Sequence, residues 1–317
     1  MISPYYIDYY ARLLTGSDLK GTTAWAGVRA SKCKGACELE LWPEYIENVS
    51  NQQLALADQD AKKRRSAFYQ RCFNIEDIKI SLLQNGPILL SFNVYMSFYD
   101  SYCDGIVPMP NSIDRWLGSH CVAVIGYDEN KRFLKFVNSW GESYGDSGFG
   151  YLPYDYMNDH AIEAVADVTI KKFAADSTSG INKWIVHNGE ILRLFCGVSR
   201  GYTFTHNNIM LYDLFDSKNN LLGWIINSKI NSTTVELIDF FVWPENRNRG
   251  YGQLLIDQMI EYEQKIGVKN IIGWVSMDET RILGVESATQ FFRKRHWNYV
   301  HKTYDFMWSP GQLTLEL

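Results

Sequence analysis

Two short segments hold residue types that can carry out acid–base chemistry. The first, SHCVAVIGY, begins at Ser119 and places His120 on an apolar, strand-like run. The second, VNSWG, places Asn138 and Trp140 at the end of the next such run. Along a hairpin, the ring of His120 can donate to the side-chain carbonyl of Asn138, and Trp140 can shield that hydrogen bond from water. An ordinary hairpin with an incidental histidine is the alternative interpretation of the same residues.

A third segment, residues 236–256, joins a strand, a glycine-containing loop and a helix. Its loop contains Arg247, Arg249, Gly250 and Gly252. Glycines let the backbone approach a ligand closely, and the start of a helix presents N–H groups and a positive dipole end to a pyrophosphate. The two arginines add charge-assisted donors. The pattern is neither a Rossmann fingerprint, which needs a third glycine, nor a Walker A loop, and a simple turn is the alternative.

The apolar spacing predicts the elements that must position these segments. Ser3 and Asn74 are the expected caps of two helices, residues 31–50 are expected to form a loop, and the polar stretch 171–182 is expected to contain the domain boundary. Helices are predicted at 4–14, 54–69, 75–83, 253–266 and 287–295. Strands are predicted at 88–96, 120–128, 133–140, 149–157, 190–198, 208–216, 221–228, 235–243, 270–276 and 304–308.

Composition and charge narrow the class of function. The 317 residues suggest two domains at roughly 150 residues each, and the 46% of hydrophobic residues excludes a disordered chain. A net charge of −5 argues against a nucleic-acid partner. The first residues form no signal peptide, no apolar stretch is long enough to span a membrane, and the six cysteines form no CxxC pair. We therefore expect a cytoplasmic protein with no membrane partner and no metal site.

Taken together, SHCVAVIGY and VNSWG resemble the papain-like cysteine peptidases of the C1 family, which carry an H-A-V-x-x-V-G-Y strand and an N-S-W-G strand. The stretches GPILLSFNVYMSFYDSYCDGIV, CELELWPEYIEN and SPYYIDYYARLL extend the resemblance over about residues 1–165. It implies that His120 is a general base and that Asn138 orients it.

The chain departs from that family in its nucleophile. The family's cysteine lies in a Q-x-x-C-G-x-C-W stretch, which we expect upstream of SPYYIDYY, and none of the six cysteines lies in such a motif. Cys121 follows His120 on a strand, so its side chain points to the other face. Without a thiolate and an oxyanion donor the acyl-enzyme route is closed. Three interpretations stay open: a degenerate binding module, a chain truncated relative to its gene, or a half-domain completed by an N-terminal complementing segment from another chain.

The third segment resembles the GNAT (GCN5-related) acetyltransferases. The stretch VWPENRNRGYG matches their acetyl-CoA loop, and the order of elements extends the resemblance over about residues 183–308, including an A-x-x-F-F-x-K helix from Ala288. The resemblance implies acetyl-CoA as the cosubstrate, an amine as the acceptor and backbone groups of a splayed strand as ligands. The residues implied in cosubstrate binding are Phe240, Val242, Arg247, Asn248, Arg249, Gly250, Tyr251 and Gly252.

The same resemblance suggests acid–base residues. Glu236 lies 11 residues before Arg247, where one branch of the family keeps its general base, and a glutamate that simply begins a surface strand is the alternative. Counting with period two places Glu236 on the face of Phe240 and Asp239 on the opposite face. Where the family has a tyrosine that acts as the general acid, this chain has Phe292, whose ring cannot donate a proton. Its substitutes would be Tyr299, Tyr304 or solvent.

We therefore expect an α+β protein. A partial papain-like domain over residues 1–170, without a nucleophile segment and used for binding, precedes a GNAT domain over residues 183–317. The predicted function is acetyl-CoA-dependent N-acetylation of an amine, carried by a small molecule, a peptide or a protein. The first alternative is an active cysteine peptidase whose nucleophile lies on a missing N-terminal segment, with the GNAT domain as an accessory. The second is a pure binding protein with two degenerate sites.

Overall fold

The computed structural model describes residues 1–15, 22–46, 48–72, 74–169, 177–200, 208–275, 291–292, 298–300 and 311–316. Two compact units make up the fold. One joins residues 1–68 with residues 169–317, and the other consists of residues 69–168. Within the described ranges, no helix is both long enough and apolar enough to cross a lipid bilayer.

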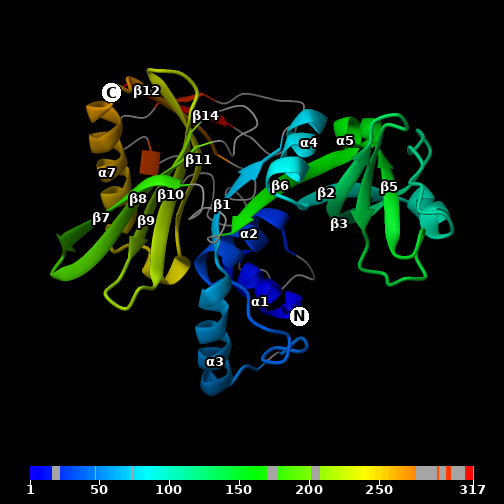
Figure 1. The fold of residues 1–317 in the computed structure, drawn as a ribbon, viewed down its shortest axis with the longest axis horizontal. Helices are drawn as coiled ribbons and strands as arrows, with labels where there is room; N and C mark the ends of the chain where they lie inside the picture. The colour runs from blue at the N-terminus through cyan, green and yellow to red at the C-terminus, as the bar shows by residue number, and fades with distance from the viewer. Residues whose placement is uncertain are drawn as a thin grey trace. The chain divides into compact units, whose positions relative to one another are not determined.

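The first sheet has six strands in the order β1-β6-β2-β3-β4-β5 (Figure 1). Its strands are β1 Ser66–Arg71, β2 Ile88–Tyr95, β3 Trp116–Asp128, β4 Phe133–Val137, β5 Phe149–Pro153 and β6 Ala161–Thr169. The pairs β2–β3, β2–β6, β3–β4 and β4–β5 are antiparallel. Helices α4 Ile75–Gln84 and α5 Tyr154–His160 and the 3-10 helix η2 Met96–Tyr102 complete this part.

Alternating apolar residues bury one face of this sheet. Along β2, Ile88, Leu90 and Phe92 are buried while their neighbours are more exposed, as expected for a strand with one covered face. In β4, Phe136 fills the space where a side chain at Gly150 of β5 would stand, because a Cβ there would lie 2.2 Å from the Phe136 ring. Gly150 therefore allows the two strands to pack at this point.

The second sheet has eight strands in the order β13-β14-β12-β11-β10-β9-β8-β7. Its strands are β7 Ser177–His187, β8 Glu190–Arg200, β9 Asn208–Phe215, β10 Leu221–Lys229, β11 Thr234–Val242, β12 Asn270–Val275, β13 Asn298–Val300 and β14 Gly311–Glu316. The pair β11–β12 is parallel and the other described pairs are antiparallel. The long helix α7 Tyr251–Lys265 connects the two parallel strands, as parallel pairing requires.

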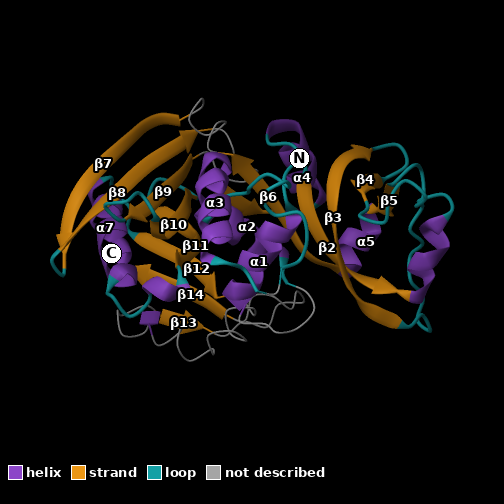
Figure 2. Cartoon of the chain, turned by 90° about the horizontal axis from the view of Figure 1, so that it is seen from below, coloured by secondary structure: helices purple, strands orange, loops and turns teal. Residues whose placement is uncertain are grey.

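Helices cover both faces of the middle of the second sheet. Helix α7 packs on one face over an apolar cluster that includes Tyr212, Ile225 and Leu255. Helix α2 Ala24–Cys33 contacts β10 (Figure 2). It brings Arg29 to Asp239 of β11 at 2.5 Å. Strand β10 is consequently buried along nearly its whole length.

The N-terminal helices begin at side-chain caps. Helix α1 Pro4–Thr15 begins where Ser3 Oγ accepts from the N–H of Tyr6, and Thr23 caps α2 in the same way. Helix α3 Asn51–Ala61 continues into the 3-10 helix η1 Lys62–Arg64.

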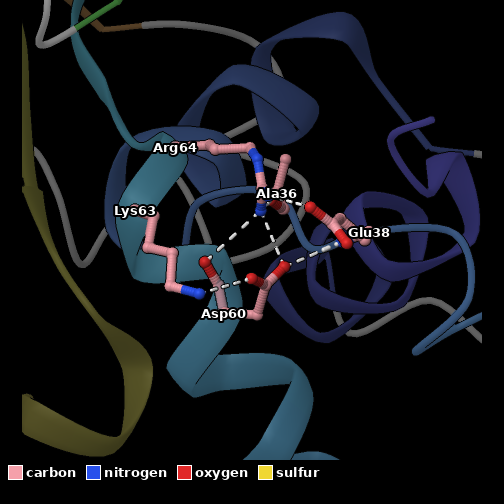
Figure 3. A network of polar contacts seen from close by, with 5 residues as sticks. All are labelled: Ala36, Glu38, Asp60, Lys63 and Arg64. Atoms are coloured by element: carbon pink, nitrogen blue, oxygen red, sulfur yellow. Dashed lines mark hydrogen bonds and ion pairs between the residues drawn. The ribbon is translucent and has the colours of Figure 1, made fainter.

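A charged network fastens this end of α3 to the loop after α2 (Figure 3). Arg64 donates to Asp60 at 2.7 Å and to Glu38 at 2.5 Å, and Lys63 donates to Asp60 at 3.0 Å. Burial by itself would raise the pKa of Asp60, but hydrogen bonds from Lys63, the Glu38 N–H and Arg64 lower it to about 2. The carboxylate is therefore ionised at neutral pH.

Several sequence predictions of local structure are wrong. Helix α2 reaches into the stretch predicted as a loop, because its buried face carries charged residues that hide the apolar period. The predicted helix at 54–69 ends earlier, and its last residues belong to β1. The strand predicted at 149–157 turns into α5 at Tyr154. Strands β6, β7, β13 and β14 had not been predicted.

The predicted domain boundary and two predicted elements near the C-terminus fall mostly outside the described residues. Part of the stretch 171–182 lies in β7, and the rest lies outside the described residues. The predicted strand at 304–308 and all of the predicted helix at 287–295 except Phe291 and Phe292 also lie outside them. The division into domains at residues 170 and 183 stays a prediction.

Candidate active sites

His120 and Asn138 meet as the sequence predicts. His120 lies in β3 opposite Phe92 of β2, and Asn138 follows the last residue of β4. Since β3 and β4 are antiparallel neighbours, the end of β4 returns to the middle of β3. Nε2 of His120 lies 2.9 Å from Oδ1 of Asn138.

The backbone decides which ring nitrogen carries the proton. Oδ1 of Asn138 also accepts from the N–H of Ser139 at 2.8 Å. A backbone N–H can only donate, so this contact orients the amide with its oxygen toward His120. In the neutral ring, Nε2 must then be the donor, and Nδ1 keeps its lone pair. The arrangement can accept a proton at Nδ1, which a general base requires.

Aromatic rings enclose the pair. Asn138 is buried, and the His120 ring lies 5.4 Å from the ring of Trp140 and about equally far from Phe92 and Phe98, at 6.1 and 6.0 Å. The predicted shielding of the hydrogen bond by Trp140 fits this geometry. Trp140 itself is 37% exposed, so it covers the pair only in part.

For five of the six cysteines, the surroundings disfavour an activated thiol. Burial raises the pKa of Cys33 to about 12 and that of Cys37 to about 11. Burial also raises the pKa of Cys72 and takes that of Cys196 to about 12. Cys121 lies next to His120 in β3 and so points to the other face. A raised pKa disfavours the thiolate, which is the nucleophilic form.

The second site begins where β11 leaves regular pairing. Ile238 has no partner in β10, although Leu237 and Asp239 on either side of it are paired. This is a β-bulge. The parallel pairing with β12 ends at Leu237 and Gly273, whereas β11 continues to Val242. Among the described residues, the edge of β11 beyond Leu237 therefore faces no partner strand on the β12 side.

The bulge also changes which residues of β11 share a face. Val235 and Leu237 belong to the apolar cluster under α7, and after the bulge Phe240 packs against the same cluster. Glu236 is consequently on the opposite face from Phe240 and on the same face as Asp239. The expectation that Glu236 and Phe240 share a face is wrong, because counting by two assumes a strand without a bulge.

Asp239 and Glu236, the two candidates for a general base, lie in different surroundings. Asp239 is buried and accepts from Arg29 and from Trp224 Nε1, the latter at 2.8 Å. These contacts occupy both carboxylate oxygens, so Asp239 is a structural residue. Glu236 is only partly buried, and its role as a general base stays a prediction.

The loop after β11 brings glycines to the start of α7. Gly250 has a left-handed φ of 81° directly before the helix, and Asn248 also lies in the left-handed region. A Cβ at Gly250 would stand 2.8 Å from Nε2 of His187, and one at Gly252 would stand 3.2 Å from the Phe240 ring. No side chain caps the helix at Gly250. The first turn of α7 is thus presented without a capping group, as an anion site at a helix start requires.

The turn between β7 and β8 braces this loop. Arg249 forms an ion pair with Glu190, and the hydroxyl of Tyr251 donates to the same carboxylate. Burial and this hydrogen bond raise the pKa of Tyr251 to about 12. Arg247 donates from Nε to the carbonyl of Val242 at 3.1 Å. In the structure both arginines therefore have partners within the protein.

Sequence reasoning missed the bracing residues. Nε2 of His187 lies 3.1 Å from the carbonyl of Arg249, and Asn188 donates to that carbonyl at 3.3 Å. The dipeptide Asn188-Gly189 was an available signal, because Asn-Gly between alternating residues marks a tight hairpin turn. Both residues have positive φ, as such a turn requires.

The acid of the second site stays unassigned. Phe292 is buried, and its ring lies 5.8 Å from Phe240. Tyr304 lies outside the described residues, and for Tyr299 only the backbone, in β13, is described.

Comparison with known families agrees with this geometry. Residues 30–189, half of the chain, match the papain family of cysteine proteases. The chain belongs to the papain family. Residues 186–296 match the acetyltransferase (GNAT) family. The protein is thus a papain-like domain followed by a GNAT domain, as the sequence predicts.

Individual relatives cover only parts of this papain-family chain. An uncharacterized peptidase C1-like protein of Acanthamoeba polyphaga mimivirus is 30% identical over 193 residues, which cover 55% of the chain and 62% of that relative. The chain therefore spans less than two thirds of that protein's length. Xylellain, a cysteine protease from Xylella fastidiosa, is 24% identical with a TM-score of 0.48 and covers 53% of this chain and 70% of that one. A GNAT-family acetyltransferase of Staphylococcus aureus is 15% identical with a TM-score of 0.29 and covers 34% and 68%.

Proposed function

We propose that the protein transfers an acetyl group from acetyl-CoA to an amine. The observation that carries the proposal is the splayed strand β11, followed by the loop that ends at Gly250 before the uncapped start of α7. The match of residues 186–296 to the GNAT family supports the same chemistry.

In this proposal the chain's own groups divide the work. The N–H groups at the start of α7 hold the pyrophosphate of acetyl-CoA. Gly250 and Gly252 let this start of the helix pack closely against His187 and Phe240. The open edge of β11 around Phe240 and Val242 binds the pantetheine arm and polarises the acetyl carbonyl. Acetyl transfer forms a bond from the amine nitrogen to the carbonyl carbon and sends the amine's proton to a base, for which Glu236 is our candidate. The thioester bond breaks, and CoA leaves as a thiolate that takes a proton from Tyr299, Tyr304 or solvent.

A pair of glycine variants tests the proposal. Isothermal titration of the full chain with acetyl-CoA should show binding, and Gly250→Glu should abolish it, because a side chain at residue 250 would collide with His187 and distort the loop that leads into α7. Gly267→Glu is the matched control: Gly267 also has a positive φ, of 86°, but lies at the other end of α7, where a Cβ would meet nothing within 4 Å. Equal affinity in the two variants, or no binding by the unmodified chain, would contradict the proposal.

A second candidate rests on the pair His120–Asn138. We propose that the pair serves as the base half of a cysteine peptidase site, with the thiol supplied by a complementing segment. The hydrogen bond that leaves Nδ1 as the acceptor supports this proposal. The test is hydrolysis of a fluorogenic peptide by the chain with and without an added peptide that contains a Cys-Gly-x-Cys-Trp sequence.

The hydrolysis assay separates three outcomes. Hydrolysis that needs the added peptide and is lost in Asn138→Ala supports the second candidate. Hydrolysis by the chain alone, blocked by a thiol-directed epoxide, would show that one of its own cysteines serves instead. No hydrolysis in either case would contradict the second candidate.

A further inference from the structure

Helix α2, in the N-terminal segment of the chain, places two cations on the second sheet. Arg29 pairs with Asp239 of β11, and Lys32 pairs with Asp213 of β9 at 2.9 Å. All four side chains are buried, with Lys32 only 1% exposed. The two pairs are therefore alike in origin and burial but reach different strands.

The Arg29 pair lies at the bulge of β11. Asp239 is the first paired residue after Ile238. Nη2 of Arg29 reaches one carboxylate oxygen at 2.5 Å, and Trp224 Nε1 reaches the other at 2.8 Å. The Arg29 guanidinium also lies 4.6 Å from the centre of the Phe241 ring. The residues just after the bulge are thus held from the face that α2 covers.

The face on which the Asp239 carboxylate lies differs between two possible registers of β11. In a regular strand Asp239 would share a face with Val235 and Leu237, and that face is the apolar cluster under α7. An ionised carboxylate there, without a partner, would be strongly unfavourable. The bulge at Ile238 moves Asp239 to the other face, where Arg29 neutralises it. The ion pair therefore favours the bulged register over the regular one.

The bulged register is also the one that forms the proposed acetyl-CoA cradle. It places Phe240 against the α7 cluster, beside Gly252 in the first turn of α7, and it accompanies the separation of β11 from β12. We propose that Arg29 is a positioning residue for the acetyltransferase site: by pairing with Asp239 it holds the bulge at Ile238 and so keeps the open edge of β11 in place. This inference rests on the proposed function for its effect on acetyl-CoA, whereas its structural part does not.

The test compares two neutral double variants of the full chain. Arg29→Met with Asp239→Asn removes the pair at the bulge, and Lys32→Met with Asp213→Asn removes the matched pair at β9. Neutralising both partners avoids a buried unpaired charge, so both variants should fold. Urea unfolding measures the global stability of each, and amide hydrogen exchange is then followed at residues 238–242 without ligand.

We expect exchange at residues 238–242 to rise about tenfold in the Arg29/Asp239 variant relative to the Lys32/Asp213 variant at equal global stability. The affinity for acetyl-CoA should fall by about the same factor in the first variant only. Arg29→Lys with Asp239 intact keeps a positive charge beside the carboxylate. Its exchange at residues 238–242 and its affinity for acetyl-CoA should therefore lie between those of the unmodified chain and those of the Arg29/Asp239 variant. Equal exchange in the two double variants overturns the inference. Failure of the unmodified chain to bind acetyl-CoA contradicts the proposed function instead, and the exchange comparison still decides the role of Arg29.

Discussion

A fragment that begins at Ser177 and contains only the second sheet and its helix should not fold by itself. Helix α2 and its neighbour α1 cover three large side chains on the outer face of that sheet. Trp224 is 0% exposed, Phe241 6% and Trp243 3%. Lys34 of the same N-terminal segment lies 4.8 Å from the centre of the Trp243 ring. Removing residues 1–68 would expose this whole face to water.

The expected cost is comparable to the stability of a domain. Exposure of each large apolar side chain costs about 1.5–3 kcal/mol, so the three together cost about 5–9 kcal/mol. A whole domain is stable by only about 5–15 kcal/mol. The aspartates that pair with Arg29 and Lys32 also lose those partners, although water can then solvate them.

Near-ultraviolet circular dichroism and urea unfolding of the fragment 177–317 provide the assay. We expect no cooperative transition, and we expect one to return when residues 1–68 are supplied as a second chain. A fragment of residues 69–168 serves as the comparison, because it forms the other compact unit. Cooperative unfolding of the fragment 177–317 at the urea midpoint of the full chain would refute this reasoning.

Three further predictions concern single carboxylates. Asp60→Asn should lower the free energy of unfolding by about 1–2 kcal/mol at pH 7. Since the folded pKa of Asp60 is lowered to about 2, the stabilisation by its carboxylate should be present above about pH 4 and disappear as the pH falls toward 2. Urea midpoints across that pH range measure this loss. Burial raises the pKa of Glu263 above 4.5, so this group costs stability as the pH rises. Glu263→Gln should therefore gain stability relative to the parent as the pH rises above about 4.5 in the same assay. Glu236→Gln should slow acetyl transfer about 10²–10⁴-fold in single-turnover kinetics while leaving the acetyl-CoA affinity unchanged, and an unchanged rate would make Glu236 structural.

Both candidate sites could be located from the sequence because each is encoded locally. His120 and Asn138 are 18 residues apart on neighbouring strands, so one tight hairpin is enough to bring them together. The segment from Arg247 to Gly252 is continuous in the chain. The left-handed turn at Gly250 favours glycine whatever the rest of the fold is. Local patterns of apolar residues likewise predicted most strands near these sites.

Helix α2 could not be predicted from its pattern of apolar residues. Its buried positions include Arg29 and Lys32, which an amphipathic pattern would place in solvent. The partners that make this burial favourable, Asp239 and Asp213, are 210 and 181 residues away in the chain. No local rule can anticipate such a pairing, because its free energy depends on which element covers which face of the sheet.

The sequence by itself determined which residues could do chemistry and which segments alternate between apolar and polar. The tertiary structure alone decided the bulge at Ile238, and with it the faces of Glu236 and Asp239. A strand's period of two is a property of its backbone, but a bulge forms only where partner strands and buried charges make the irregular register lower in free energy. Here the charge that selects the register comes from Arg29, in a stretch that the family resemblance assigns to the preceding domain.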